Sequence, residues 1–153
     1  MGAWISTHDK PGWTQITGTG LEHLRGLMQL QELHLDGTQT NDGGLVQLRE
    51  LSHLVHLSLR GTQASDVGLV NLRGLTGLRV LVLSDTQITG VGLEHLRGMS
   101  QLEELLLDGT QVHGLKHLQG LPQLRRLELY DTQVTDSDVK ELEKALPNAF
   151  IGR

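Results

Sequence analysis

Histidines and their acidic neighbours are the residues of this sequence that come nearest to acid–base chemistry. The chain has eight histidines and no cysteine, which excludes disulfide bonds, cysteine-based zinc sites and thiol catalysis. His34 and His56 come close to Glu32 and Asp36 in the repeat pattern described below, and a carboxylate beside an imidazole can make a pH-sensitive surface. We interpret this cluster as structural pairing rather than as a catalytic site.

Neither a metal site nor a nucleophile is indicated elsewhere. His113 and His117 stand four residues apart and could supply two ligands, whereas a catalytic zinc site takes three from the protein. Ser58 and Ser84 follow a strand pattern without the strained turn of an activated nucleophile. The glycines recur at repeat spacing and do not form a phosphate-binding loop. The sequence therefore predicts no metal, no cofactor and no catalytic residues.

Regularly spaced arginines raise the question of nucleic-acid binding, because such a stripe could follow a phosphate backbone. Glu22 and Glu94 precede two of these arginines by three residues, a helical spacing that neutralises them. The net charge is −5 and only 3% of the residues are aromatic. We therefore predict no nucleic-acid partner. The arginines that share this register are Arg25, Arg49, Arg73 and Arg97.

The length of 153 residues fits one domain or a short repeat array. No apolar run reaches the roughly 18 residues of a membrane span. The first residues lack the basic start and apolar stretch of a secretory signal. We expect a cytoplasmic protein without a membrane partner, a monomer or weak homodimer, unless the chain is a fragment of a larger protein.

A Thr-Gln dipeptide marks an internal repeat. Successive copies begin 24 residues apart, except that the last interval is 22 because two residues are missing after Val112. The copies begin at Thr14, Thr38, Thr62, Thr86, Thr110 and Thr132. We predict a single domain over residues 1–153, made of an N-terminal plug (1–13, with Trp4, Ile5 and Trp13), repeats at 14–37, 38–61, 62–85, 86–109 and 110–131, and a C-terminal capping half-repeat at 132–153.

The units resemble leucine-rich repeats, whose pattern is L-x-x-L-x-L-x-x-N/C-x-L. The resemblance is carried by LQELHLDGTQT, LVHLSLRGTQA, LRVLVLSDTQI, LEELLLDGTQV and LRRLELYDTQV. The T-D-x-G-L segment is similar to repeats of bacterial proteins, and threonine stands where the family usually has asparagine or cysteine. The resemblance implies an α/β fold: a right-handed leucine-rich repeat solenoid, a ribonuclease-inhibitor-like horseshoe arc with a parallel β-sheet on the concave face and short helices on the convex face.

Leucine spacing assigns the elements within each unit. Each L-x-L pair has the period of a strand, and G-L-x-x-L-x-x-L has that of a helical turn. Inward helical stripes are predicted at Leu21, Leu24 and Leu27, and at Leu93, Leu96 and Met99. Helix N-caps are predicted at Thr17, Asp42, Ser65, Thr89 and Asp136. We also expect the repeated glutamines to hydrogen-bond along the stack, and residues 149–151 to form a last strand.

The residues between and beside the inward leucines face the concave surface in this register. Val80, Val82 and Leu106 form an apolar centre, and an apolar cluster with a polar rim indicates a contact surface. The rim consists of His56, Arg60, Glu104, Arg126 and Tyr130, of which arginine and tyrosine are favoured at interface hot spots.

Family analogy then predicts a non-catalytic protein–protein interaction module that binds a protein or peptide on this face. One alternative is a structural, self-associating repeat with no ligand of its own, or a part of a larger multidomain protein. Another is an enzyme or a sugar-binding surface, for which the open strand face offers no pocket.

Overall fold

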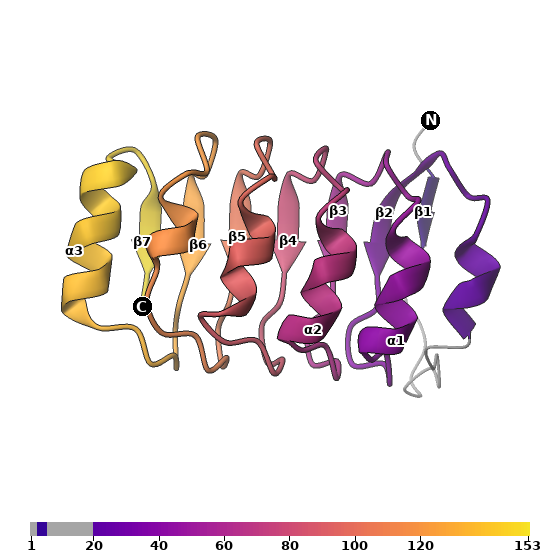
Figure 1. The fold of residues 1–153 in the computed structure, drawn as a ribbon, viewed down its shortest axis with the longest axis horizontal. Helices are drawn as coiled ribbons and strands as arrows, with labels where there is room; N and C mark the ends of the chain where they lie inside the picture. Colours follow the sequence, from indigo (N-terminus) through magenta and orange to yellow (C-terminus); the bar gives the residue numbers. More distant parts are fainter. Residues whose placement is uncertain (1–2, 6–19) are drawn as a thin grey trace.

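The computed structural model describes residues 3–5 and 20–153, which form one layer of parallel strands backed by one layer of short helices (Figure 1). The sheet has seven strands in the order of the sequence, and every neighbouring pair is parallel. The strands are β1 (Ala3–Ile5), β2 (Leu30–His34), β3 (His56–Ser58), β4 (Val80–Val82), β5 (Glu104–Leu106), β6 (Arg126–Glu128) and β7 (Phe150–Gly152). The predicted α/β solenoid is confirmed.

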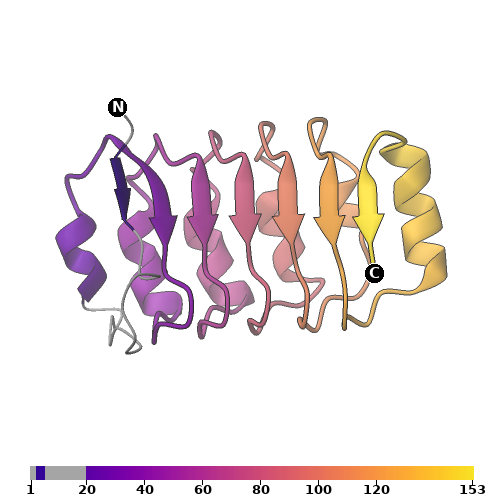
Figure 2. The same cartoon turned by 180° about the vertical axis from the view of Figure 1, so that it is seen from behind.

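The helical layer consists mostly of single turns, and the sheet lies open on the other side (Figure 2). Its elements are η1 (Gly20–Leu24), α1 (Asp42–Leu45), η2 (Val46–Leu48), α2 (Asp66–Leu69), η3 (Val70–Leu72), η4 (Gly92–Leu96), η5 (Lys116–Leu118) and α3 (Asp136–Ala145). Among the described elements, α3 alone is longer than five residues. None of the described helices has the length and apolarity that crossing a bilayer requires.

Leucines from both layers make one continuous core between the sheet and the helices. The inward residues of adjacent strands lie in register, so that each leucine stacks on its equivalent in the next unit. The predicted stripe of Leu93, Leu96 and Met99 is fully buried. The stripe of the first unit is wrong at Leu27, which is 43% exposed, because among the described residues no helix precedes η1 to cover it.

Two helix caps differ from the prediction by one residue and a third by two, because the residue before η4 is Val91 and not the predicted Thr89. Asn41 caps α1 and Thr135 caps α3, whereas Ser65 caps α2 as predicted. At α1 and α3 the predicted aspartate is instead the first residue of the helix. Thr17 lies outside the described residues.

The aspartate that begins α1 joins neighbouring units. Asp42 accepts hydrogen bonds from the backbone N–H and the hydroxyl of Ser65, at 2.8 and 2.6 Å. Asp66, one unit later, does the same for Thr89, at 2.8 and 2.6 Å. These carboxylates therefore tie the start of one convex segment to the start of the next.

In the repeated Thr-Gln pair, the threonine is the residue whose side chain forms a hydrogen bond. Each described threonine hydroxyl donates to the carbonyl of the leucine three residues before it, as Thr62 does to Leu59 at 2.7 Å. The neighbouring glutamine side chains are exposed. The predicted glutamine ladder is wrong, because what bonds along the stack is the backbone N–H of the glutamine, as from Gln63 to the carbonyl of Thr40 at 2.9 Å.

The sequence pattern predicted the last strand of the sheet but not the first. β1 pairs with β2 although no L-x-L motif precedes Thr14. The side chains of Trp4 and Ile5, and all of Trp13, lie outside the described residues, so the plug remains a prediction. The predicted last strand exists as β7, shifted by one residue, with Ile151 opposite Leu127 as the count from the first unit requires.

Candidate interaction surface on the concave sheet

The predicted apolar centre lies on two neighbouring strands. Val80 and Val82 flank the buried Leu81 on β4, and Leu106 lies opposite Val82 on β5. Alternate residues of a strand point to opposite faces, so the burial of Leu81 and Leu105 turns the other three side chains to the open face. All three are partly exposed. The structure therefore brings together the apolar centre inferred from the sequence.

His56 and Arg60 bound this centre on the β3 side. His56 lies opposite Val80 and is half-buried. Its ring centroid is 4.5 Å from that of His34, with the rings tilted by 46°. Arg60 is exposed, and its Nε donates to Oδ2 of Asp85 at 3.1 Å. This part of the rim is thus already partnered within the protein.

The imidazole of His56 favours the neutral form. Burial lowers its pKa below the ordinary value, and the positive charge that His34 can carry lowers it further. The carboxylates of Glu32, Asp36 and Glu104 oppose this shift without reversing it. The His56 ring is therefore packed against the His34 ring in the sheet surface, with its neutral form favoured.

Glu104, Arg126 and Tyr130 bound the centre on the β6 side. Nη1 of Arg126 lies 3.6 Å from Oε2 of Glu104, and its Nε donates to Oε1 of Glu128 at 2.9 Å. The hydrogen bond with Glu128 raises the pKa of Arg126 above its ordinary value. Tyr130 is 49% exposed, and its backbone N–H donates to Oδ1 of Asp108 at 3.0 Å. The five rim residues thus surround the apolar centre on both sides.

Phe150 is a surface residue that the sequence analysis missed. It lies on β7 opposite Arg126 and is 61% exposed, so it extends the rim past β6. A signal was available, because aligning Ile151 with Leu33 places Phe150 in the column of His56, Val80 and Glu104.

Catalytic or metal-binding geometry is not found on this face. The described residues hold no group of three or more histidines and carboxylates that could bind a metal ion. Ser58 donates to the carboxylate of Asp36, and Ser84 to Oδ2 of Asp108 at 3.3 Å. Neither hydroxyl is bonded to a histidine base. His113, the first of the predicted two-ligand pair, lies on the opposite, helical side of the molecule.

Comparison with known proteins agrees with this architecture. A family model described as leucine rich repeat matches residues 52–112. No curated protein sequence matches the chain. The match lies within the solenoid, so residues 52–112 and the fold both correspond to leucine-rich repeats.

Solved structures with this fold include two internalins of Listeria monocytogenes. InlF shares 26% sequence identity at a TM-score of 0.71, over 82% of this chain and 35% of its own. Internalin C2 shares 23% identity at a TM-score of 0.67, over 92% of this chain and 76% of its own. TLR13, solved with a single-stranded RNA, shares 22% at a TM-score of 0.62, over 82% of this chain and 18% of its own. This chain therefore spans about a third of the length of InlF.

Proposed function

We propose that this protein is a non-catalytic interaction module that binds a protein or peptide segment on the concave sheet. The observation that carries the proposal is the strand register. It sets Val82 directly against Leu106, with Val80 on the same face, in the middle of the open sheet. An apolar cluster with a polar rim is the ordinary form of a protein contact surface.

The rim favours a partner that inserts apolar side chains. Arg60 is paired with Asp85, and Arg126 with Glu104 and Glu128, so the rim charges are compensated before any partner arrives. A ligand therefore gains little by neutralising them. Tyr130 and the stem of Arg126 offer flat contact surface around the centre.

A nucleic acid is a poorer ligand for this face, although one structural neighbour was solved with RNA. That neighbour is 22% identical and supports the fold alone. The present chain has a net charge of −5, and its concave arginines are already paired. Binding of single strands usually combines a cationic groove with stacked aromatic rings.

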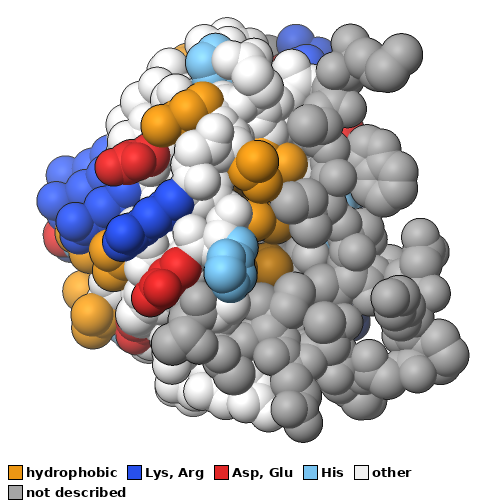
Figure 3. All heavy atoms as spheres, turned by 90° about the vertical axis from the view of Figure 1, so that its right-hand side faces the viewer, with side chains coloured by type: hydrophobic (Ala, Val, Ile, Leu, Met, Phe, Trp, Pro, Cys, Tyr) orange, Lys and Arg blue, Asp and Glu red, His pale blue; other side chains and the backbone are white. Residues whose placement is uncertain are grey.

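Self-association is the second candidate, and it has one specific observation behind it. Leu27 and Met28 are both exposed in the first described unit. Figure 3, which faces the β1 end, shows hydrophobic side chains interspersed with charged ones over the described surface there. Light scattering separates the two candidates, because concave-face variants leave end-to-end association intact.

The test is selection of random dodecamer peptides displayed on phage against the purified chain. We expect enriched peptides with two or more large apolar residues. Their affinity should fall about tenfold or more for the Val80→Glu/Val82→Glu/Leu106→Glu variant, since the contact centre becomes charged. Fluorescence anisotropy of one labelled peptide measures the change.

A matched control carries Val67→Glu and Val91→Glu, two strongly exposed valines of the helical face. This control should bind as the unaltered chain does, and circular dichroism should show both variants folded. Since the central valines are half-buried, the three glutamates could destabilise the fold. A Val82→Thr/Leu106→Thr variant, which adds no charge, therefore serves as a second test of the same surface. Peptides that bind all four proteins equally would refute a concave binding site.

A further inference from the structure

Carboxylates outnumber arginines on the concave face of the sheet. Arg60 is bound by Asp85, and Arg126 by Glu104 and Glu128, so both arginines are neutralised within the protein. The face keeps an excess of negative charge, which attracts a positively charged partner and repels an anionic one. The charged residues on and directly after the strands of this face are Glu32, Asp36, Glu104, Asp108 and Glu128, against Arg60 and Arg126.

Three of these carboxylates belong to the part of the face formed by β5 and β6, where one arginine serves them. Nη1 of Arg126 lies 3.6 Å from Oε2 of Glu104, and its Nε donates to Oε1 of Glu128 at 2.9 Å. Asp108 forms no ion pair with any residue that the structure describes, and its Oδ1 accepts from the backbone N–H of Tyr130 at 3.0 Å. One positive charge therefore faces three negative ones beside the apolar centre.

Glu128 is the most buried of the three and has an oxygen without a partner. It is only 7% exposed. Oε1 accepts from Arg126, whereas Oε2 is buried and has no hydrogen-bond partner in the described part of the chain. An unbonded oxygen of this kind is costly, because burial removes the water that would otherwise bind it. Glu128 therefore has an acceptor to offer to a ligand.

Gly152 and Tyr130 define where this oxygen lies. Glu128 lies opposite Leu106 on one neighbouring strand and opposite Gly152 on the other. A Cβ on Gly152 would overlap Oε2 of Glu128 and would lie 3.2 Å from Cε2 of Tyr130. The oxygen therefore occupies the space of the missing side chain, beside the edge of the Tyr130 ring. The apolar centre begins one strand away, at Leu106.

The helical face carries arginines, and its carboxylates do not offer an equivalent site. The Nε of Arg25 donates to Gln47 at 2.6 Å. Glu94 lies 3.5 Å from Nη2 of Arg73, so this carboxylate already has a cation. The predicted neutralisation of Arg97 by Glu94 is wrong for the same reason.

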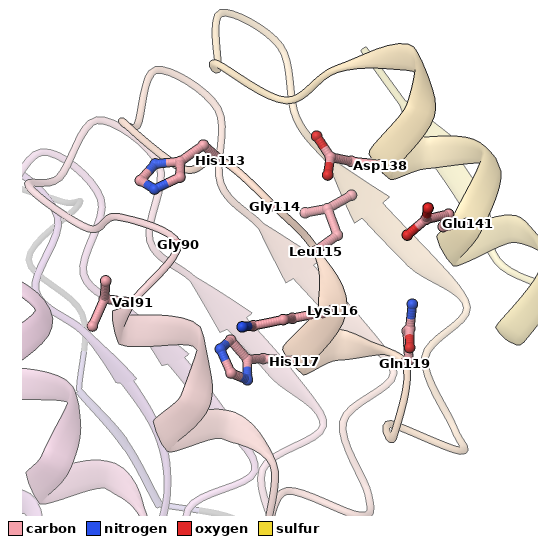
Figure 4. Close-up of a pocket in the computed structure, with 10 residues that line it drawn as sticks. All are labelled: Gly90, Val91, His113, Gly114, Leu115, Lys116, His117, Gln119, Asp138 and Glu141. Atoms are coloured by element: carbon pink, nitrogen blue, oxygen red, sulfur yellow. The ribbon is translucent and has the colours of Figure 1, made fainter.

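A hollow of about 380 Å³ on the helical face is also a poorer place for a cation. Asp138 and Glu141 border it from α3, but Lys116 lies across from them and repels a second positive charge (Figure 4). Asp138 is held in the capping box of α3. His113 lies apart from His117 there, so the two rings do not share a metal ion.

We propose that the partner of the concave face carries an arginine next to its apolar residue, and that Glu128 binds the guanidinium of this arginine. The inference rests on the proposed function, because it names the charge of the same partner segment. The guanidinium displaces the edge of the Tyr130 ring, donates to Oε2 of Glu128 and stacks on the ring. The neighbouring apolar residue of the partner reaches Leu106, since adjacent strands lie about 4.8 Å apart.

An arginine fits this place better than a lysine for two reasons. A guanidinium is more weakly hydrated than an ammonium group, so it loses less on reaching a buried acceptor. It is also flat, so it can lie on the ring of Tyr130 while its edge donates to Glu128. The charges of Glu104 and Asp108 add attraction without direct contact.

The experiment titrates the ¹⁵N-labelled chain with N-acetyl-arginine N-methylamide, which carries one guanidinium and no large apolar group. We expect saturable shifts at the amides of Glu128, Tyr130 and Gly152, with a dissociation constant in the millimolar range. The neutral isostere N-acetyl-citrulline N-methylamide should give no saturable shift. Because this probe does not need the apolar centre, its failure is distinct from a failure of the peptide selection.

Glu128→Gln keeps the shape of the side chain and removes its charge, so it should weaken binding of the arginine probe about tenfold. Glu32→Gln is the matched control, because it removes a carboxylate of the same face on β2, four strands away. That separation is about 19 Å, beyond the screening length of about 8 Å at physiological salt, so the affinity should stay within about twofold. Asp108→Asn, which keeps the acceptor for Tyr130, should weaken binding about threefold and tests the site independently of Glu128. The amide spectrum of each variant shows whether it is folded.

Equal shifts with the citrulline probe, or unchanged affinity in both Glu128→Gln and Asp108→Asn, would overturn the site. Equal weakening by Glu32→Gln would mean that the general charge of the face, and not Glu128, holds the arginine. Tighter binding of N-acetyl-lysine N-methylamide would overturn the choice of arginine. Selected dodecamers that bind the apolar centre without any basic residue would support the proposed function and contradict this inference.

Discussion

At the scale of single residues, the Thr-Gln pair shows that a regular pattern does not reveal which of its two residues makes the buried hydrogen bond. Both residues recur in every unit, and the recurrence of the glutamine predicted that its side chains hydrogen-bond along the stack. The structure buries the threonine and exposes the glutamine. The reason is geometric: the turn after each strand brings the threonine hydroxyl under the carbonyl three residues back.

Replacing Thr62 by valine should therefore destabilise the protein by about 1 kcal/mol, the usual net value of a buried hydrogen bond. The shape is conserved, but the bond from the hydroxyl to Leu59 is lost. Gln63→Ala, next to it, should change the free energy of unfolding by less than about 0.5 kcal/mol. Urea unfolding of both variants measures the difference, and equal effects would contradict this assignment.

At the scale of one repeat, the short fifth unit explains an irregularity in the fourth. Asp42 and Asp66 begin their segments and bind the next unit, but Gly90 stands at the equivalent place. A Cβ on Gly90 would overlap the carbonyl oxygen of His113. Shortening the fifth unit moves its backbone onto this position, so glycine is required there.

Thr135 compensates for the carboxylate that is missing from the fifth unit. Ser65 and Thr89, which occupy the same place in their units, are bound by an aspartate of the preceding unit. Thr135 instead forms a capping box with Asp138 of its own helix. The start of α3 is thereby closed without help from the preceding unit.

We expect Gly90→Ala to destabilise the protein by about 1–3 kcal/mol, the range for inserting a methyl group where none fits. Gly120→Ala is the control, because no atom lies within 4 Å of a Cβ there. That change should be neutral or slightly stabilising, as alanine restricts the unfolded chain. Thermal unfolding of the two variants checks the contrast. A Gly90→Ala protein as stable as the parent would show that the two backbones are not in contact.

Much of this unit-level structure followed from the leucine pattern, and the rest depended on contacts that no local pattern contains. The strands could be placed because an L-x-L pair has one face to bury. The contact between Asp42 and Ser65 joins residues one unit apart, which no local pattern predicts. The caps of α1 and α3 were predicted one residue late because two adjacent polar residues could each have been the cap. β1 could not be placed because Ala3–Ile5 has no L-x-L pair, the motif that marks the other strands up to β6. The apolar centre was found because it depends on register alone.

At the scale of the whole molecule, α3 closes the core at its C-terminal end. Val139, Leu142 and Leu146 are buried and belong to the same hydrophobic cluster as the strand leucines. Because each unit contacts only its neighbours, the stability of such a stack is close to a sum of local terms and interface terms.

Leu142→Ala should therefore lower the stability of the entire chain by about 2–5 kcal/mol, as for other buried leucines. Lys144→Ala, exposed on the same helix, should cost less than about 0.5 kcal/mol. Urea titration followed by circular dichroism should show one transition at a lower midpoint. An early separate phase limited to α3 and β7 would mean that the last unit unfolds alone.

The constant spacing of partners along the stack also bears on how the chain reaches this structure. Each strand pairs with the strand of the next unit, and Asp42 and Asp66 bind residues about one unit away in the sequence. Ordering any two adjacent units therefore closes only a short loop. Short loops cost little chain entropy and are associated with fast folding. Assembly can begin at any such pair and spread in both directions. We expect this spread to be slowest at the fifth unit, which lacks the aspartate connection to its neighbours.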